Sequence, residues 1–160
     1  MNKSDFNFSI VIPIFNEGDN IGSLIKEIIH QINNNYNYEI IIVDDASTDN
    51  VNIILKEFDS LDFIKIIKNA ANLGQSQSIK SGIINSRFEN IITIDGDGQN
   101  DPADIPKLLE IFLSKRDIEL VGGLRLKRRD NIIKVISSKI ANNVRSFILN
   151  DDCKDTGCSL

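Results

Sequence analysis

Short apolar runs alternate with longer amphipathic segments along this chain, and this alternation limits the possible folds more than any other feature. Continuous apolar stretches cover residues 8–14, 39–43, 63–67, 90–94 and 118–121. Apolar residues recur at helical spacing over 20–32, 51–58, 75–87, 105–113 and 132–149. Strands without polar alternation are typical of sheets that are buried on both faces. The pattern therefore predicts an α/β fold with a mostly parallel central sheet and helices on both faces.

Two local expectations follow from the same periodicity. In the segment 75–87, we expect Ile79, Ile83 and Ile84 to face the sheet, because they share one side of a helix. Before the segment 51–58, we expect Ser47 or Thr48 to cap the helix, because a hydroxyl can accept a hydrogen bond from a free N–H group at a helix start.

Composition excludes several classes of protein. The chain has 160 residues, which is typical of one domain. No run approaches about 18 apolar residues, so the sequence predicts no transmembrane helix. Two cysteines and a single histidine argue against a disulfide scaffold, a zinc knuckle and chemistry built on histidine clusters. His30 lies in the first predicted helix, where we expect a structural role.

Charge is unevenly distributed along the chain. The formal net charge is -5, yet residues 115–145 contain nine lysines and arginines against three acidic residues. Such a run is either a solvated helix face or a local site for an anion. Nucleic-acid-binding proteins usually present a broader basic surface, so we expect no nucleic-acid partner.

Polar residues follow four of the predicted strands. In parallel α/β sheets, ligands bind outside the carboxyl ends of the strands. Those ends are followed by FNEG at 15–18, DDAS at 44–47, NLG at 72–74 and DGDGQND at 95–101. One such end is ordinary turn chemistry, but four ends on the same rim favour a binding site.

The fourth of these segments carries the clearest chemical signal. Asp95 and Asp97 lie two positions apart, directly after an apolar strand. Two neighbouring carboxylates disfavour each other's ionisation unless a cation lies between them. Hard cations such as Mg²⁺ or Mn²⁺ prefer oxygen ligands and keep coordination sites for substrate phosphates. The pair therefore predicts a divalent metal site, with simple turn formation as the alternative.

The motifs together resemble a known family. They are IVIPIFNEGDNI, EIIIVDDASTDN, NLGQSQSIKSGI and IITIDGDGQNDPADIPKLL, in this order. They resemble family 2 glycosyltransferases, which have the Rossmann-like GT-A fold of nucleotide-diphospho-sugar transferases. DGDGQNDP, VGGLRLKR and DTGCSL are most similar to the branch of dolichyl-phosphate mannose synthases and bacterial polyprenyl-phosphate glycosyltransferases. The resemblance runs from Ser9 to Leu160 and implies one catalytic domain over 1–160, which we expect to be cut short at its C-terminal end.

The resemblance implies roles for the residues that bind the donor. It assigns the nucleotide pocket to Pro13, Phe15 and Glu17, and the contacts with the base to Val43 and Asp45, with Asp44 beside them. It assigns the divalent metal on the donor diphosphate to Asp95, Asp97 and Gln99, with Gly96 in close contact. The structural alternatives are core packing for Pro13, Phe15 and Val43, and helix capping for Glu17, Asp44 and Asp45.

The resemblance also implies an acceptor site. Arg125 would face a phosphate, and Lys134 and Ser138 would bind the phosphate of the acceptor. Lys134 stands where the branch typically has arginine, and lysine keeps the charge but loses the bidentate fork. Asp155 matches a position proposed to orient or deprotonate the acceptor, so Asp97 and Asp155 are the expected catalytic residues. A solvated surface is the alternative for Arg125 and Lys134, and a turn is the alternative for Asp155.

The function that the resemblance implies is inverting transfer of a sugar from a GDP- or UDP-sugar to a polyprenyl or dolichyl phosphate. A phosphate monoester is already largely anionic at neutral pH, so it needs no strong general base. We expect the enzyme to work at the cytoplasmic face of a membrane as a peripheral protein. Two alternatives remain open: transfer to a sugar hydroxyl in polysaccharide or capsule synthesis, and a catalytically silent fragment that binds nucleotide sugars.

Overall fold

The central sheet has the predicted parallel arrangement. The computed structural model describes residues 6–32, 36–115 and 117–123. In this part of the chain, four strands pair in the order β3-β2-β1-β4, and every pairing is parallel. Their bounds are Asn7–Ile14 for β1, Asn37–Asp44 for β2, Ile64–Lys68 for β3 and Ile91–Thr93 for β4. The register brings the carboxyl ends of β1 and β2 together, since Ile14 lies opposite Asp44.

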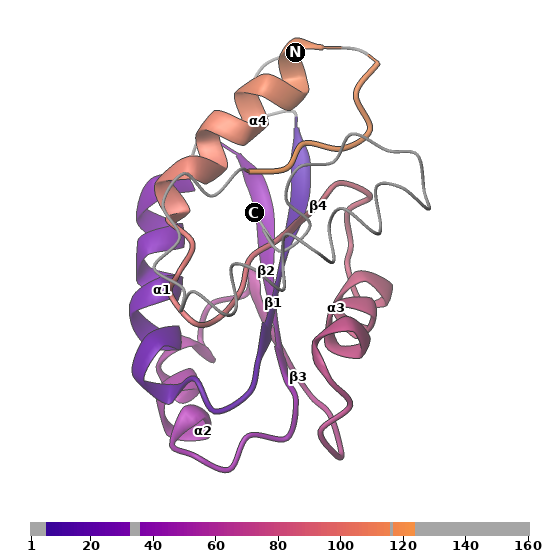
Figure 1. Ribbon diagram of the computed structural model, residues 1–160. Coiled ribbons are helices and arrows are strands. Elements are labelled where there is room, and N and C mark those ends of the chain that lie inside the picture. The colour runs from indigo at the N-terminus through magenta and orange to yellow at the C-terminus, as the bar shows by residue number, and fades with distance from the viewer. Residues whose placement is uncertain (1–5, 33–35, 116, 124–160) are drawn as a thin grey trace, which may run out of the picture.

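Helices cover both faces of the sheet, as predicted. The helices are α1 (Gly18–Ile32), α2 (Val51–Leu55), α3 (Gln75–Ile84) and α4 (Ile105–Ser114), with 3₁₀ turns η3 (Lys56–Phe58) and η4 (Pro102–Asp104). Helices α1, α2 and α4 lie on one side of the sheet and α3 lies on the other (Figure 1). The described elements therefore form three layers, with the sheet in the middle.

The core is thick on one side of the sheet and thin on the other. On the first side, Phe8, Ile10 and Ile12 of β1 belong to a large buried cluster with α1 and α4. On the second side, Val11 belongs to a small buried cluster with two residues of β2. A Cβ atom on Gly82 of α3 would collide with the Val11 side chain, so glycine allows α3 to pack closely on β1.

Helix α3 differs from its prediction in length and in orientation. It ends at Ile84, and the side chains of Ile83 and Ile84 are 45% and 71% exposed. Its buried residues are Ser78 and Gly82, four positions apart and therefore on one side of the helix. The prediction that Ile83 and Ile84 face the sheet was wrong, because the helix approaches the sheet through its small residues.

Two further expectations were wrong. Residues 118–121 form no strand, and Leu120 is 87% exposed. Neither Ser47 nor Thr48 caps α2, whose N-cap is Asn50 without a side-chain cap bond. The Ser47 hydroxyl instead accepts a hydrogen bond from the Asn16 N–H group at 2.9 Å, so it joins two loops.

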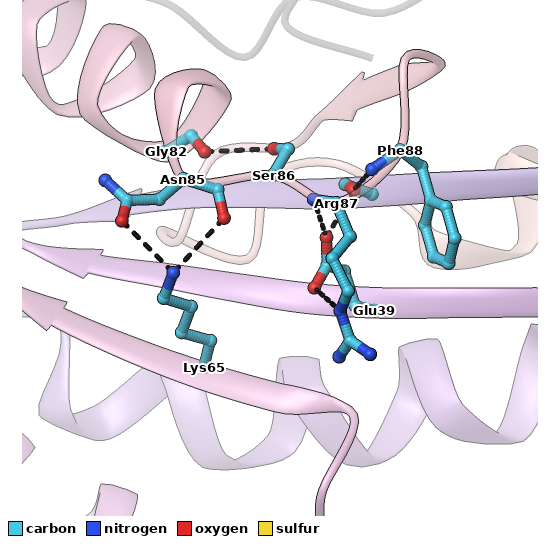
Figure 2. A network of polar contacts seen from close by, with 8 residues as sticks. Glu39, Lys65, Gly82, Asn85, Ser86, Arg87 and Phe88 are labelled. Atoms are coloured by element: carbon cyan, nitrogen blue, oxygen red, sulfur yellow. Dashed lines mark hydrogen bonds and ion pairs between the residues drawn. The ribbon is translucent and has the colours of Figure 1, made fainter.

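The amino-terminal end of the sheet is closed by a network of polar contacts (Figure 2). Glu39 of β2 is buried, and its carboxylate accepts hydrogen bonds from the Ser9 hydroxyl at 2.7 Å and from the Arg87 N–H group at 2.6 Å. The Arg87 Nε atom pairs with the second Glu39 oxygen at 3.1 Å. Lys65 of β3 donates to Asn85 at the end of α3. These contacts attach the connection from α3 to β4 to the sheet.

No helix in the described ranges is both long enough and apolar enough to cross a membrane. The helix predicted over 132–149 and most of the basic segment 115–145 lie outside the described residues.

Candidate active site

A cavity of about 250 Å³ opens at the carboxyl end of β1 and between the loops that follow β2 and β4. It is lined by Pro13, Ile14, Phe15, Glu17, Asp45, Gln75, Ser78, Asp95, Gly96 and Asp97. Asp45 and the neighbouring pair Asp95 and Asp97, about 50 positions further along the chain, thus line one cavity. Residues from the segments after β1, β2 and β4 therefore gather at one edge of the sheet, whereas residues 72–74 do not line the cavity.

Hydrogen bonds join the loops that follow β1 and β2 beside this cavity. The Thr48 N–H group donates to the Asn16 Oδ1 atom at 2.8 Å, and the Gly18 N–H group donates to Asp49 Oδ2 at 2.8 Å. Asn16 and Ala46 have left-handed backbones, with φ values of 57° and 62°. Asparagine tolerates this conformation better than alanine does, so the turn at Ala46 is held against a local preference by the surrounding contacts.

Asp45 ties the loop between β3 and α3 to the end of β2. Its Oδ1 atom accepts hydrogen bonds from Asn69 Nδ2 at 2.7 Å and from the Leu73 N–H group at 2.9 Å. Its Oδ2 atom accepts one from the Gly74 N–H group at 2.7 Å. Burial alone would raise the pKa of Asp45, but these hydrogen bonds outweigh it and hold the pKa below its ordinary value. The side chain is therefore an anion that holds the loop in place.

Asp44, directly before it, has a different environment. Its side chain is 1% exposed, and its Oδ1 atom accepts a hydrogen bond from the Ser47 N–H group at 2.8 Å. Its Oδ2 atom lies 3.6 Å from Lys68 Nζ. Val43 is fully buried in the small cluster on the α3 side of the sheet. Neither residue lines the cavity, and the contact of Val43 with a nucleotide base, with Asp44 beside it, stays a prediction.

The turn after β4 carries Asp95 and Asp97 into the cavity. Gly96 between them is buried, and a Cβ atom there would collide with the Ile14 side chain and lie 3.2 Å from the Pro13 carbonyl oxygen. Asp97 Oδ1 accepts a hydrogen bond from the Gln99 N–H group at 3.0 Å, and Gly98 completes the turn with a φ of 70°. Glycine at 96 thus brings both carboxylates against the end of β1.

The residues fit a divalent metal that a substrate helps to hold. Within 6–32, 36–115 and 117–123, no three histidine, cysteine or acidic side chains form a group that could bind a metal by themselves. Mg²⁺ is commonly held by one or two carboxylates together with substrate phosphates. Asp95 and Asp97, in a cavity open to a ligand, supply that donor set. The Gln99 side chain is exposed and lies outside the cavity lining, so its role as a metal ligand stays a prediction.

The other residues predicted to bind the nucleotide sugar line the cavity at the end of β1. Phe15 lines the cavity and is 44% exposed, so its side chain is accessible to a ligand. The carboxylate of Glu17 accepts a hydrogen bond from Asn20 Nδ2 at 2.7 Å in the first turn of α1. Arg125, Lys134, Ser138 and Asp155 lie outside the described residues.

The sequence analysis did not assign Gln75 and Ser78, which also line the cavity. Gln75 Nε2 donates a hydrogen bond to Asp95 Oδ1 at 2.6 Å. Ser78 Oγ accepts one from Asn69 Nδ2 at 3.1 Å. The signal that could have found them is the segment NLG at 72–74, which lies on the same rim and directly precedes Gln75.

Comparison with known proteins identifies relatives of this chain. Residues 9–156 match the family model of glycosyl transferase family 2. The dodecaprenyl-phosphate galacturonate synthase of Rhizobium johnstonii is 34% identical over 95% of this chain and 46% of its own length. The undecaprenyl-phosphate 4-deoxy-4-formamido-L-arabinose transferase of Proteus mirabilis is 32% identical over 95% of this chain and 47% of its own length. The chain thus spans about half the length of the curated relatives it matches.

Solved structures share the fold. The glucosyl-3-phosphoglycerate synthase of Mycobacterium tuberculosis, in complex with Mn²⁺, UDP and phosphoglyceric acid, superposes with a TM-score of 0.71 at 19% identity. This superposition covers 90% of this chain and 50% of that one. The parallel sheet with helices on both faces is therefore a GT-A fold. From the match over residues 9–156, we conclude that this chain belongs to glycosyl transferase family 2.

Proposed function

We propose that this chain carries the donor-binding and catalytic part of a metal-dependent, inverting glycosyltransferase. It would move a sugar from a UDP- or GDP-sugar to a polyprenyl phosphate. One observation carries the proposal: the carboxylates of Asp45, Asp95 and Asp97 line one cavity at the carboxyl ends of parallel strands. Ligands of open α/β sheets bind at this edge.

The cavity suggests how the donor would lie. The exposed ring of Phe15 and the carboxylate of Glu17 would border the nucleotide, and the loop held by Asp45 would close the opposite side. Asp95 and Asp97 would hold Mg²⁺ or Mn²⁺ against the diphosphate. When bound, the metal would neutralise charge that develops on the leaving diphosphate. Gly96 keeps this turn close to β1, so that both carboxylates face the donor.

The reaction is a displacement at the anomeric carbon of the sugar. An oxygen of the acceptor phosphate would form a new bond to that carbon from the face opposite the leaving group. The bond from the carbon to the diphosphate oxygen would break, and the nucleoside diphosphate would leave with the bonding electrons. Configuration is then inverted. Because the phosphate nucleophile is already anionic near neutral pH, no histidine base is required.

The acceptor is proposed from relatives and from the basic segment. The names of two relatives contain dodecaprenyl phosphate and undecaprenyl phosphate. Residues 115–145 have an excess of positive charge that suits an anionic lipid head group. Arg125, Lys134 and Ser138 would bind the acceptor phosphate, and Asp155 would orient it. We place the reaction at the cytoplasmic face of a membrane, where such a lipid would present its phosphate.

Donor binding can be tested by thermal unfolding of the chain with a panel of UDP- and GDP-sugars, with and without Mn²⁺. A ligand that binds the folded state raises the unfolding temperature in proportion to the logarithm of its concentration over its Kd. We expect one nucleotide class to stabilise the chain, and to do so much more with Mn²⁺. If no nucleotide sugar stabilises it at millimolar concentration, the proposal is rejected.

The acceptor can be tested with the same donor and two acceptors, a polyprenyl phosphate and a free oligosaccharide. We expect transfer to the lipid alone. Lys134→Ala should raise the KM for the lipid by about tenfold, because a phosphate contact is lost, and leave the Kd of the donor unchanged. Transfer to the oligosaccharide would favour a hydroxyl acceptor instead, and donor binding without any transfer would favour a silent fragment.

A further inference from the structure

Gln75 connects the loop before α3 with the turn after β4 in the candidate active site. It is the first residue of α3, directly after the loop that Asp45 holds. Its Nε2 atom donates to Asp95 Oδ1 at 2.6 Å, and both side chains line the same cavity. Gln75 lies within the motif NLGQSQSIKSGI, and the residue roles implied by the family resemblance do not include it.

The backbone that carries Gln75 is held in place by Asp45, the residue directly after β2. The N–H groups of Leu73 and Gly74 donate to the buried carboxylate of Asp45 at 2.9 and 2.7 Å. Gly74 has a φ of 87°, a left-handed conformation that favours glycine, and its carbonyl accepts the Ser78 N–H group at 3.1 Å. These contacts fix the backbone of the loop where it enters α3, so they also fix the backbone position of Gln75.

The backbone that carries Asp95 is held independently, from β1. Ile94 is fully buried, and its N–H group donates to the Val11 carbonyl oxygen at 3.2 Å. Gly96, on the other side, packs against Ile14. Since both backbones are held, the hydrogen bond between Gln75 and Asp95 determines how the Asp95 carboxylate is rotated.

The chemistry of an amide suits this task. A glutamine nitrogen donates a hydrogen bond without carrying a charge, so it orients Asp95 and leaves the carboxylate's negative charge intact. A lysine in this place would neutralise that charge. Groups that orient metal-binding side chains commonly change metal affinity by 10–100-fold when they are removed.

We propose that Gln75 is a positioning residue: through its hydrogen bond it orients the Asp95 carboxylate and sets the divalent metal affinity of the Asp95 and Asp97 pair. This inference rests on the proposed function, because it assigns the pair to a metal. It also means that the loop held by Asp45 carries the group that orients the metal-binding carboxylate.

The test removes the hydrogen-bonding amide of Gln75 and keeps the length of the side chain. Gln75→Met removes the amide, and Gln77→Met is the matched control, since Gln77 is exposed in the same helical turn and does not line the cavity. The Kd of Mn²⁺ is measured by calorimetry on the full chain saturated with UDP. We expect Gln75→Met to raise this Kd by about tenfold and Gln77→Met to leave it within twofold.

Activity supplies a second measurement. The Mn²⁺ concentration for half-maximal transfer should rise in Gln75→Met, while kcat at saturating Mn²⁺ stays within about twofold, because only the metal affinity has changed. Gln75→Ala repeats both measurements if Gln75→Met unfolds at a lower temperature than the control.

The outcomes separate this inference from the proposed function. If the wild type binds Mn²⁺ with UDP and both methionine variants match it, Gln75 has no positioning role, yet the proposed function stands. If the wild type itself shows no Mn²⁺ binding with UDP, both proposals are overturned, because the carboxylate pair then holds no metal. A loss of kcat at saturating Mn²⁺ with an unchanged Kd would also reject the positioning role.

Discussion

At both ends of the sheet a buried carboxylate holds a loop next to α3, but only one of these carboxylates lies at the candidate active site. At each end, a buried carboxylate in β2 or directly after it accepts hydrogen bonds from the backbone of a connection that flanks α3. Asp45 binds the connection that enters α3, and Glu39 binds the connection that leaves it (Figure 2). Only Asp45 borders the cavity. A buried carboxylate is therefore a stabilising element in itself, and it becomes part of a site only where the neighbouring loop supplies ligand-facing groups.

The largest effect is expected at the cavity. Asp97→Asn should lower metal-dependent transfer by at least about 100-fold, because the loss of a metal ligand removes several kcal/mol of charge stabilisation in the transition state. The unfolding temperature should stay within a few degrees. Asp62→Asn, the same change at an exposed position before β3, is the control. Transfer near the wild-type rate in Asp97→Asn would remove this residue from the metal site.

Glu39 of β2 and Asp45, which directly follows β2, can be compared by paired substitutions. Glu39→Gln and Asp45→Asn should each lower the free energy of unfolding by about 2 kcal/mol, since each weakens hydrogen bonds to a buried anion. Only Asp45→Asn should also weaken binding of UDP with Mn²⁺, by about tenfold, because its loop carries Gln75. Denaturant unfolding and calorimetry on the same samples supply both quantities. Equal nucleotide affinity in the two variants would show that Asp45 contributes no more to nucleotide binding than Glu39 does.

The pH dependence of stability should report both networks. The pKa of Glu39 is lowered: burial opposes this, but the hydrogen bonds from Arg87 and Ser9 and the charge of Arg87 outweigh it. The pKa of Asp45 is lowered as well. Each network therefore stabilises the fold above the ordinary carboxyl pKa of about 4 and loses that contribution as the pH falls through the lower folded value.

We expect the free energy of unfolding to fall as the pH is lowered below about 4, and this slope to be shallower in Glu39→Gln and in Asp45→Asn. Urea unfolding between about pH 3 and pH 7 measures the slope. A slope unchanged by either substitution would show that neither carboxylate has a lowered pKa in the folded chain.

The smallest effect is expected on the solvent side of the Glu39 network. Arg87→Met should lower the free energy of unfolding by less than about 1 kcal/mol, because the Arg87 side chain is 67% exposed and exposed ion pairs contribute little. The Arg87 N–H group, which donates at 2.6 Å, remains in this variant. A loss as large as that of Glu39→Gln would mean that the guanidinium, not the backbone contact, dominates the network.

Much of the fold was predictable, because burial follows a local period. The apolar runs that became β1 and β2 and the helical spacing that became α1 were recognised to within a few residues. The prediction was wrong for 118–121, which form no strand, and for Ile83 and Ile84, which are exposed. A short apolar run shows only that burial would be favourable, and a β-branched side chain on a helix does not reveal which side meets the sheet.

The candidate site was predictable in its position and only partly in its detail. Parallel strands all end at one edge, so polar residues after successive strands had to gather there, and Asp45, Asp95 and Asp97 do line one cavity. The linear order of residues does not show that Asp44 turns toward Lys68 while Asp45 binds the loop before α3. Nor does it show that Gln75 contacts Asp95 across 20 positions.

Periodicity and strand-end residues are local properties of the chain, so they decided the layer architecture, the edge of the sheet at which the candidate site lies and the acidic character of that edge. The contacts between loops depend on how distant segments pack: Gly82 on Val11, Gly96 on Ile14 and Asp45 on Gly74. Those contacts decided which carboxylates line the cavity and which side chain contacts Asp95, because the direction of a side chain depends on neighbours that lie far away along the chain.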